Sequence, residues 1–492
     1  MSSIQQHTIP TEVRFVSDTL EQNGFFAYLV GGCVRDMLLE RKPNDWDVAT
    51  NATPEKIISL FEKTIYENTF GTVGVCIPKE GTMPEEKQYE IVEVTPFRTD
   101  GAYTDNRHPD SVTFSDTIQD DLRRRDFTIN AFAYRIASDE LLDLFDGKND
   151  LQNKTLRAVG VASIRFEEDA LRMLRAVRFS SQLGYAIEVN TLVAITEKNE
   201  LLKHVSSERI REEFSKIIMS PEPMTGIAIL QKLGLLKHFI PELEEGIGCI
   251  QGGAHKYDVY EHLLHALQHA ADKKWPLEIR LAALFHDIGK PKTRRTGIKK
   301  AYTFYGHEVI GARMTKKILE RMKYPKDTIE LVTNLVRYHM FFSDTEQITL
   351  SAVRRVVANI GKENVWTLMN VRECDRVGMA KKEAPYRLRK YHAMLDQVLR
   401  DPISVSQLSI HGQDLITLGI KPGPRMGWIL HALLEEVLDD PTKNTREHLE
   451  ELVRVLNSLE DRELKALGEK GKEKKDELEE NEISKLNKKH NI

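Results

Sequence analysis

The sequence is poor in cysteine and has no long apolar run. Its four cysteines, Cys33, Cys76, Cys249 and Cys374, lie far apart and form no C-x-x-C pair. This spacing argues against a disulfide framework or a zinc finger, and it favours reduced thiols in a reducing compartment. No run of about 18 apolar residues occurs, and the N-terminal residues MSSIQQHTIP lack the apolar stretch of a signal peptide. We therefore expect a cytoplasmic protein with no membrane segment.

The chain also lacks a strong charge of one sign. Charged residues make up 29% of it, yet the formal net charge is only -5. A nucleic-acid partner would have to be bound through local basic patches, because the overall charge would not attract it. With 492 residues, 41% of them hydrophobic, the chain is too long for one ordinary domain.

The pattern of residues changes along the chain and predicts an α+β fold. Short β-rich runs such as GTVGVCI and YEIVEVTPF indicate a small mixed-sheet domain near the N-terminus. Helical spacing follows, first in a region with basic helices and then in one rich in histidine. Pro and Gly turns then introduce a further helical unit, and the end is dense in Lys and Glu, typical of a solvated helix or a disordered tail. We expect the boundaries to be 1–155, 156–245, 246–395, 396–461 and 462–492.

A glycine turn precedes two closely spaced carboxylates in the segment LVGGCVRDMLLERKPNDWDVAT. Gly31 and Gly32 end an apolar run, so the backbone there can approach a phosphate, and Arg35 adds a fixed positive charge. If the sequence around Asp45 and Asp47 forms a strand, both carboxylates point to one face, since side chains alternate along a strand. Two oxygen ligands on one face suit Mg²⁺ and could support two-metal transfer of a nucleotide to a hydroxyl.

This segment resembles the opening of class II tRNA nucleotidyltransferases, which comprise the CCA-adding enzymes and bacterial poly(A) polymerase relatives of the polymerase beta superfamily. The later segment DDLRRRDFTINAFAY resembles the RRDFTINA motif of the same family. The resemblance implies that Asp45 and Asp47 are catalytic Mg²⁺ ligands, that Gly32 and Arg35 bind the nucleotide, and that Arg125 binds its triphosphate. Glu93, in an alternating strand, is either a third carboxylate of this site or an ordinary surface residue.

The segment EEDALRMLRAVRF predicts one helix with Asp169, Arg172, Arg175 and Arg178 along one side, because each is three residues from the next. Spacing alone favours an ordinary amphipathic helix with an ion pair between Asp169 and Arg172. The segment resembles the EDxxR motif with which the family selects the incoming nucleotide. A carboxylate can accept from the amino group of cytosine or adenine while a guanidinium donates to the adjacent ring nitrogen, whereas uracil and guanine would mismatch both contacts. Arg175 and Arg178 are expected to reach phosphates.

Two features bear on the branch of the family. The run GTVGV resembles a strand of CCA-adding enzymes, and no basic GRRF-like stretch typical of bacterial poly(A) polymerases is present. The polar segment RTDGAYTDNRHPDSVTF resembles the flexible loop of CCA-adding and A-adding enzymes. These features favour tRNA as the substrate, and they leave an A-adding enzyme open as an alternative.

A histidine-rich block resembles the HD phosphohydrolase pattern of H, HD, H, H and D. The resemblance implies a site for one or two divalent transition metals, made by His262, His286, Asp287, His307, His339 and Asp375. His265 and His269 share a helix face with His262, and only the resemblance selects His262 among them. Such a site either hydrolyses phosphorylated RNA ends or persists as an RNA-binding scaffold. A basic cluster follows and either contacts tRNA phosphates or forms a solvated loop: Lys290, Lys292, Arg294, Arg295, Lys299 and Lys300.

Together these motifs predict a tRNA nucleotidyltransferase that adds the 3′-terminal CCA from CTP and ATP. The expected domains are a nucleotidyltransferase domain, a helical nucleotide-selecting and tRNA-binding neck, an HD domain, a C-terminal helical unit and a charged tail. The competing hypotheses are a poly(A) polymerase and an HD phosphohydrolase whose N-terminal region binds RNA. The sequence does not specify the oligomeric state.

Overall fold

The computed structural model describes residue 4 and residues 9–66, 71–78, 89–100, 112–252, 256–296, 302–342, 348–378 and 385–468. The chain divides into two compact units, residues 1–239 and 240–492. The central part of the expected flexible loop, the last two lysines of the basic cluster and the tail beyond residue 468 lie outside the described residues.

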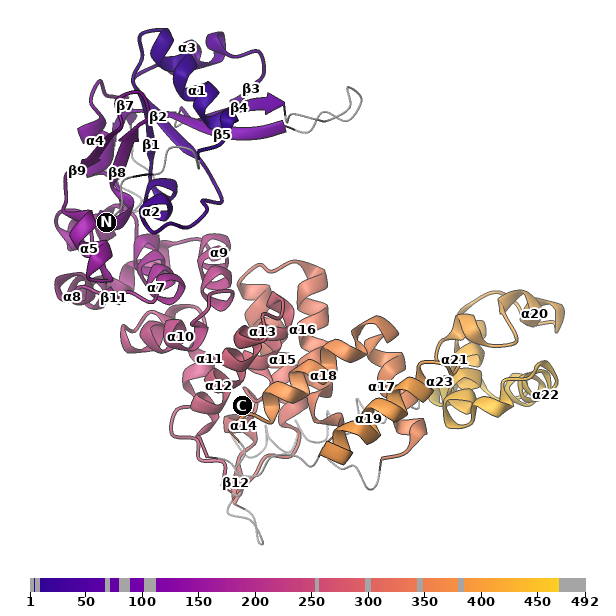
Figure 1. Ribbon diagram of the computed structural model, residues 1–492. Helices are drawn as coiled ribbons and strands as arrows, with labels where there is room; N and C mark the ends of the chain where they lie inside the picture. The colour runs from indigo at the N-terminus through magenta and orange to yellow at the C-terminus, as the bar shows by residue number, and fades with distance from the viewer. Residues whose placement is uncertain are drawn as a thin grey trace. The chain divides into compact units, whose positions relative to one another are not determined.

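The first unit is built on a seven-stranded mixed sheet in the order β3-β4-β5-β2-β1-β8-β9 (Figure 1). The strands of this sheet are β1 (Ala27–Val30), β2 (Asp47–Thr50), β3 (Thr64–Tyr66), β4 (Val73–Pro78), β5 (Tyr89–Pro96), β8 (Phe132–Arg135) and β9 (Glu140–Asp143). Strands β2 and β5 run parallel, and the other neighbouring pairs are antiparallel. The short strands β6 (Arg98–Asp100) and β7 (Val112–Phe114) form a separate antiparallel pair, made by the two ends of the segment expected to be a flexible loop.

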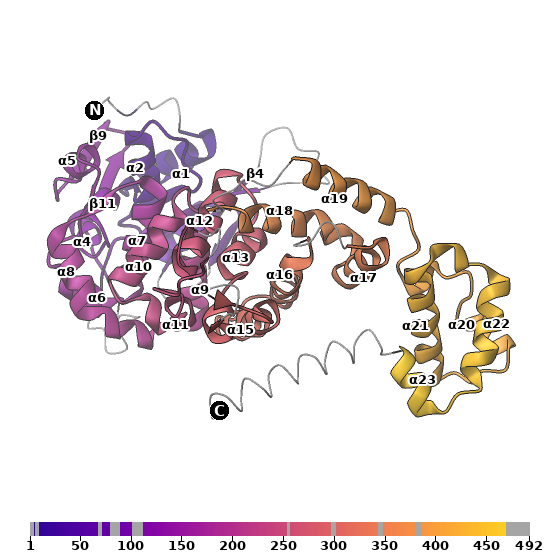
Figure 2. The ribbon, with the colours of Figure 1, turned by 90° about the horizontal axis from the view of Figure 1, so that it is seen from below.

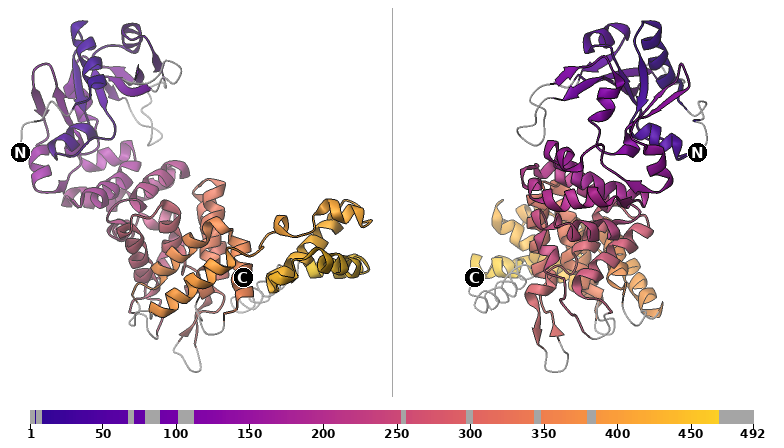
Figure 3. Two further views of the ribbon diagram at one scale, coloured as in Figure 1. Left: turned by 45° about the vertical axis from the view of Figure 1, so that its right-hand side comes forward. Right: turned by 90° about the vertical axis from the view of Figure 1, so that its left-hand side faces the viewer.

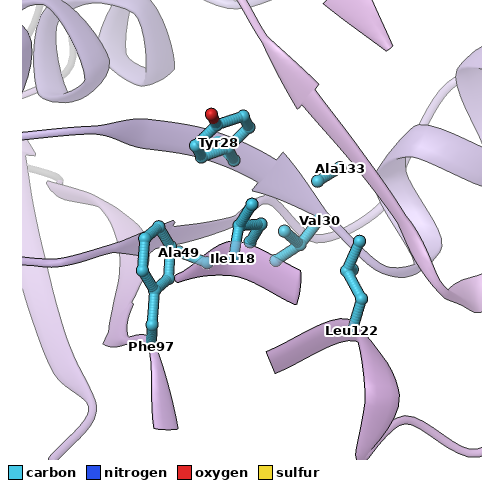
Figure 4. Close-up of a cluster of buried hydrophobic side chains, with 7 residues drawn as sticks. All are labelled: Tyr28, Val30, Ala49, Phe97, Ile118, Leu122 and Ala133. Atoms are coloured by element: carbon cyan, nitrogen blue, oxygen red, sulfur yellow. The ribbon is translucent and has the colours of Figure 1, made fainter. Parts of the chain in front are cut away.

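One face of the sheet holds a hydrophobic cluster beside strands β1, β2 and β8 (Figure 4). The helix α4 (Ile118–Arg123) contributes Ile118 and Leu122, which pack against Val30 and Ala133 of the strands. The cluster consists of Tyr28, Val30, Ala49, Phe97, Ile118, Leu122 and Ala133. Because Val30 and Asp47 are Cα partners, this cluster lies on the same face of the sheet as the Asp47 side chain.

Helices cover the sheet and continue into an all-helical region. Helices α1 and α3 pack against β5, and helices α6 to α10 form the helical region that follows the sheet (Figure 1). The helices of the first unit are α1 (Thr11–Gln22), α2 (Gly32–Leu38), α3 (Pro54–Leu60), α4, α5 (Gly147–Gln152), α6 (Ala162–Glu168), α7 (Leu171–Leu183), α8 (Val189–Lys198), α9 (Ser207–Ile218) and α10 (Pro223–Lys232). Between α5 and α8, the two-residue strands β10 (Thr155–Leu156) and β11 (Ala186–Ile187) pair in parallel.

The second unit is helical apart from a short hairpin of β12 (Arg295–Thr296) and β13 (Tyr302–Thr303) (Figure 3). Its helices are α11 (Pro241–Glu244), α12 (Val259–Asp272), α13 (Leu277–Phe285), α14 (Lys290–Thr293), α15 (His307–Arg321), α16 (Lys326–Tyr338), α17 (Leu350–Ile360), α18 (Val365–Asp375), α19 (Pro385–Val398), α20 (Gly412–Thr417), α21 (Pro424–Asp439), α22 (Arg446–Asn457) and α23 (Asp461–Gly468). Helices α20, α22 and α23 each pack against α21 (Figure 2). Arg354 of α17 donates to the carbonyl oxygens of Leu438 and Asp439, which end α21.

The predicted fold class is confirmed: a mixed-sheet domain precedes mainly helical regions. Within the described residues, no helix has the length and apolar character needed to cross a membrane. Four free cysteines are buried, as expected for reduced thiols.

Candidate functional site

The two N-terminal carboxylates lie at the start of β2, but only one of them belongs to the strand. Strand β2 begins at Asp47, so the condition that both carboxylates belong to one strand is not met. The reason is that β1 ends at Val30, the partner of Asp47, and the chain then turns at Gly31. Asp45 is exposed just ahead of the strand and remains close enough to Asp47 to affect its pKa.

Glu93 lies beside Asp47 on the neighbouring strand. The two residues are Cα partners in the parallel pairing of β2 and β5, so they are about 4.8 Å apart in the direction across the sheet. Burial raises the pKa of Asp47, the nearby guanidinium of Arg125 opposes this shift, and Asp45 reinforces it. A cation at these carboxylates would stabilise the ionised form of Asp47.

The glycine turn brings a phosphate-binding candidate next to these carboxylates. Gly31 has a φ of 76°, and a Cβ on it would lie 2.9 Å from Nη1 of Arg125 and 3.6 Å from Oδ2 of Asp47. Arg125 is held by Asp121, whose Oδ2 accepts from its Nη2 at 3.0 Å. The absence of a side chain at Gly31 therefore lets a guanidinium and a carboxylate both approach the backbone at the end of β1.

A hydrogen-bonded relay connects this turn with helix α7. Arg35 Nη1 donates to Oδ1 of Asn130 at 2.7 Å, and Asn130 Nδ2 donates to Oδ1 of Asp126 at 3.3 Å. Arg175 Nε donates to Oδ2 of Asp126 at 2.7 Å. Burial alone would raise the pKa of Asp126, but its contact with Arg175 prevails and lowers it to about 2. Arg35 and Arg175 are thus linked through two buried side chains of the segment after α4.

The helix predicted around Asp169 is interrupted. Helix α6 ends at Glu168 and α7 begins at Leu171, so Asp169 does not lie on the same helix as Arg172. Asp169 has extended backbone angles, and its Oδ1 accepts from the backbone N–H of Leu171 at 3.0 Å. An aspartate that accepts from the first N–H groups of a helix stabilises a helix start, which is the physical reason for the break.

Asp169 and Arg172 do not form the ion pair that spacing alone favours, and each pairs with another residue. Asp169 Oδ2 accepts from Nη2 of Arg209 at 2.8 Å, whereas Arg172 Nη1 donates to Oε2 of Glu168 at 2.6 Å. Arg172 also donates to the carbonyl oxygens of Arg165 and Arg124. Sequence reasoning missed Arg209, which lies on α9, because nothing in the sequence shows that α9 packs against α7.

Arg178 is almost fully buried. Its Nη1 donates to Oε1 of Glu213 at 3.0 Å, and its guanidinium lies over the ring of Phe179. Burial and the neighbouring Arg175 lower the pKa of Arg178 to about 10, although Glu213 opposes the shift. Arg175 and Arg178 therefore both pair with carboxylates of the protein. Their predicted role at phosphates stays a prediction.

In the second unit, six side chains from α12, the turn after α13, the end of α16 and helices α15 and α18 converge on one centre. The residues are His262, His286, Asp287, His307, His339 and Asp375. They form two groups of potential ligands that share Asp287, whose Oδ2 lies 3.5 Å from Nε2 of His262 and whose Oδ1 lies 3.2 Å from Nε2 of His307. One carboxylate thus presents an oxygen to each group.

The histidines of this cluster present the same nitrogen to its centre. The Nδ1 atoms of His286, His307 and His339 each lie 2.7 to 2.9 Å from the carbonyl oxygen three residues earlier. This contact places the proton on Nδ1 and leaves Nε2 as a lone-pair donor, the usual arrangement for a metal-binding imidazole. Oδ1 of Asp287 and Nε2 of His307 and His339 are buried and make no hydrogen bond, as atoms that bind a metal would.

The charges of the cluster also favour a cation. Burial opposes a charge on His286, but Asp287 and Asp375 outweigh it and raise its pKa to about 10, which shows that the two carboxylates stabilise positive charge at the centre. Burial lowers the pKa of His262 to about 3 and keeps it neutral. Lys290 Nζ lies 2.5 Å from Oδ2 of Asp287. Lys290 was predicted only as part of a basic cluster, although its spacing of three residues from Asp287 could have indicated this contact.

Among the described residues of that basic cluster, Lys292 and Arg294 also contact other side chains. The guanidinium of Arg294 lies 3.8 Å from the ring centroid of Tyr302 in the β12–β13 hairpin.

His265 stacks on Tyr257, and His269 lies 3.0 Å from a carboxylate oxygen of Glu373. Both histidines thus have other contacts, which fits their interpretation as ordinary helix residues.

Three protein families match successive parts of the chain. Residues 27–157 match the family described as "Poly A polymerase head domain", and residues 184–247 match "Probable RNA and SrmB- binding site of polymerase A". Residues 259–365 match "HD domain".

Individual proteins extend these matches over most of the chain. A CCA-adding enzyme of Lactobacillus delbrueckii subsp. bulgaricus is 33% identical over 456 residues, covering 92% of this chain and all of the relative. One from Enterococcus faecalis is 46% identical over 247 residues, covering 50% of this chain and 58% of the relative. A crystal structure of the Bacillus stearothermophilus CCA-adding enzyme in complex with CTP is similar with a TM-score of 0.67 and 27% identity, covering 91% of this chain and 98% of that one.

Proposed function

This chain belongs to the family of CCA-adding enzymes, which are tRNA nucleotidyltransferases, and we propose on that premise that it adds the 3′-terminal CCA to tRNA from CTP and ATP without a template. The observation that carries the proposal is that Asp47 at the start of β2 lies beside Glu93 of β5, while Asp47 and Arg125 both approach Gly31 after β1. The proposed substrates and the buried, unpaired cysteines fit an enzyme of the cytoplasm.

The carboxylates are the proposed catalytic metal ligands. Enzymes of this family are metal-dependent, and we assign Asp45 and Asp47 to Mg²⁺, with Glu93 as a third carboxylate beside them. Mg²⁺ held there would favour deprotonation of the 3′-hydroxyl and neutralise the charge on the departing pyrophosphate. Arg125 and the backbone at Gly32 would hold the triphosphate, and Arg35 supplies further positive charge at the same turn.

Asp169 and Arg172 are the proposed selectors of the base. The existing contacts orient both side chains without exhausting them, since a carboxylate oxygen has two lone pairs and Arg172 uses three of its five N–H donors. Arg209 orients the Asp169 carboxylate through its other oxygen. A base with an amino group beside an unprotonated ring nitrogen satisfies both selectors, which admits C and A and excludes U and G.

The test is gel-resolved extension of a labelled tRNA that ends before CCA, with Mg²⁺ and each nucleotide alone and together. Two residues added from CTP, and a third only when ATP is present, are expected. Addition of A confined to tRNA already ending in CC would instead make this an A-adding enzyme. The similarity to CCA-adding enzymes disfavours that alternative and the poly(A) polymerase hypothesis.

The HD cluster supports a second activity, the hydrolysis of phosphorylated RNA ends. One or two divalent transition metals bound by the two ligand groups would lower the pKa of a bound water to supply the nucleophile. Lys290 lies at the same centre and could bind a phosphate oxygen of the substrate. The test is phosphate release from RNA carrying a 2′,3′-cyclic or 3′ phosphate, with Mn²⁺, Co²⁺ or Ni²⁺ added to metal-stripped protein. No release with any of these metals would leave the cluster a structural or RNA-binding element.

A further inference from the structure

On the face of the sheet to which the Asp47 side chain points, only some of the strands are covered by other parts of the protein. Beside β1 and β8 this face is buried under the cluster with α4 (Figure 4). On β3 and β5 the same face presents Ile65 and Ile91, whose side chains are 40% and 53% exposed. On the opposite face, Val73 of β4 and its partner Val94 are fully buried, where α1 and α3 pack. The exposure of the isoleucines is therefore specific to one face.

The register places these isoleucines next to the catalytic carboxylates. Ile65 pairs with Gly74, Gly74 with Glu93, and Glu93 with Asp47, so the four residues form one row across the sheet. Ile91 lies two residues before Glu93 and hence on the same face. A Cβ on Gly74 would lie 3.1 Å from Cγ2 of Ile91 and 3.8 Å from Cβ of Ile65, so both side chains flank this glycine. We call Ile65, Gly74 and Ile91 the apolar shelf.

The apolar shelf lies on the side of Asp47 away from the proposed triphosphate site. Strands β1 and β5 flank β2 on opposite sides, and the turn with Gly31 and Arg125 follows β1. In nucleotidyl transfer the attacking and leaving oxygens lie roughly in line on opposite sides of the phosphorus. With pyrophosphate leaving toward the β1 side, the 3′-hydroxyl must enter from the β5 side, over Glu93. The nucleoside that carries it then lies above the apolar shelf.

We propose that the apolar shelf seats the 3′-terminal nucleoside of the RNA being extended, by contact with its base and sugar. This proposal rests on the proposed function, because it needs an RNA 3′-end at Asp47. It goes beyond that function in naming Ile65 and Ile91 as positioning residues for the acceptor end.

The chemistry of the apolar shelf suits an acceptor end that changes between steps. Each added nucleotide becomes the acceptor for the next, so the terminal base differs between the first step and the later ones. A hydrogen-bonding pocket would favour one base, whereas two isoleucines and a glycine offer contact without donors or acceptors in their side chains. Asp169 and Arg172, which are proposed to select the incoming base, have the opposite character.

A positive charge lies at the outer end of the apolar shelf. Nζ of Lys63 is 3.6 Å from the ring centroid of Tyr89, and both residues share the face of Ile91 by strand alternation. Lys63 is exposed. An RNA strand that leaves the apolar shelf away from Glu93 would therefore meet a cation that can pair with its phosphates.

The experiment compares Ile65→Asn and Ile91→Asn with Ile58→Asn. Ile58 is 39% exposed on α3 and serves as the matched control, because α3 packs against β4 and β5 away from the apolar shelf. Steady-state extension should show a KM for tRNA raised roughly ten-fold in the first two variants, with the KM for CTP unchanged. The control should behave as the parent does. Thermal melting of all three variants checks that the exposed substitutions leave the fold intact.

A second measurement reports position directly. A benzoylphenylalanine at position 91 should cross-link to the terminal nucleotide of the acceptor tRNA, and one at position 58 should not. Equal KM values for tRNA in shelf and control variants, with no cross-link at position 91, would overturn the proposal. A raised KM for CTP would assign the shelf to the incoming nucleotide and also overturn it. The unsubstituted protein is assayed beside the variants. If it adds no nucleotide to any tRNA, the proposed function itself has failed; if it is active and the variants behave like the control, only the proposal for the apolar shelf has failed.

Discussion

The two candidate metal sites differ in how far the protein buries the side chains that would bind the metal. Asp45 and Asp47 lie at the start of β2 and Glu93 lies on the neighbouring β5; Asp45 and Glu93 are exposed, and Asp47 is partly buried. The HD cluster is enclosed, and five of its six side chains are buried. An open site fits one that must admit a polymer end, a nucleotide and a cation together. An enclosed cluster fits tight metal binding, because its ligands are oriented before the metal arrives.

The strongest way to separate the two sites is the substitution Asp47→Ala. Loss of a catalytic metal ligand should lower the extension rate by at least about 1,000-fold, because metal stabilisation of the transition state is lost. Phosphate release at the HD cluster should be unchanged. Single-turnover extension and a phosphate assay on the same preparation test both statements, and appreciable extension by the variant would refute the assignment of Asp47.

The reverse substitution, Asp287→Ala, should affect only the enclosed cluster. Because Asp287 faces both ligand groups, its loss should abolish binding of transition metal to both of them. Metal content after dialysis, measured by mass spectrometry, should fall to background, while CCA addition stays within about two-fold of the parent. Retention of one metal per chain would show that one ligand group binds without Asp287.

A smaller effect is expected where a selector is held by a neighbour. Arg209→Met should release the Asp169 carboxylate and lower the preference for CTP over UTP by roughly ten-fold, since a charge-assisted hydrogen bond contributes about 1.5 to 3 kcal/mol. Competition between the two nucleotides in one reaction measures the preference. Arg211→Met, on the same helix, is the control, and an equal loss of preference in the control would contradict a specific role for Arg209.

The smallest effect concerns stability and its pH dependence. The pKa of Asp126 is lowered from 3.8 to about 2, so its stabilising contribution is complete above pH 4 and is lost as the pH falls through 2. At about 1.4 kcal/mol per pKa unit, this contribution is about 2 kcal/mol. Asp126→Asn should therefore lower the melting temperature at pH 6, and the difference from the parent should narrow at acidic pH. A constant difference from pH 6 to pH 3 would contradict the assigned pKa.

Sequence periodicity predicted the fold class because alternating and helical patterns reflect burial directly. It failed where a side chain competes with the backbone, as at Asp169, whose carboxylate starts a new helix inside an otherwise helical pattern. It also did not locate the start of β2, which leaves Asp45 outside the strand, because the length of β2 depends on where its partner β1 ends. The local pattern of apolar and polar residues shows neither the competing side-chain hydrogen bond nor the length of a partner strand.

The candidate sites were predictable to the extent that their residue types occur in recognisable motifs. The resemblance to the HD phosphohydrolase pattern implied six metal-binding residues, and in the structure these six side chains lie together. The partners of the selectors were not predictable, because Arg209 and Asp169 are 40 residues apart and meet only through the packing of α9 against α7. The roles of all these residues remain predictions for the experiments above.

The relay from Arg35 through Asn130 and Asp126 to Arg175 has a practical consequence for protein engineering. A chimaera of two family members joined near residue 155 would take Asp126 from one parent and Arg175 from the other. Any mismatch in side-chain length would leave a buried carboxylate or guanidinium without its counterpart, at a cost of several kcal/mol. Residues 35–175 should therefore come from one parent as one block, whatever boundary a domain map would draw between them.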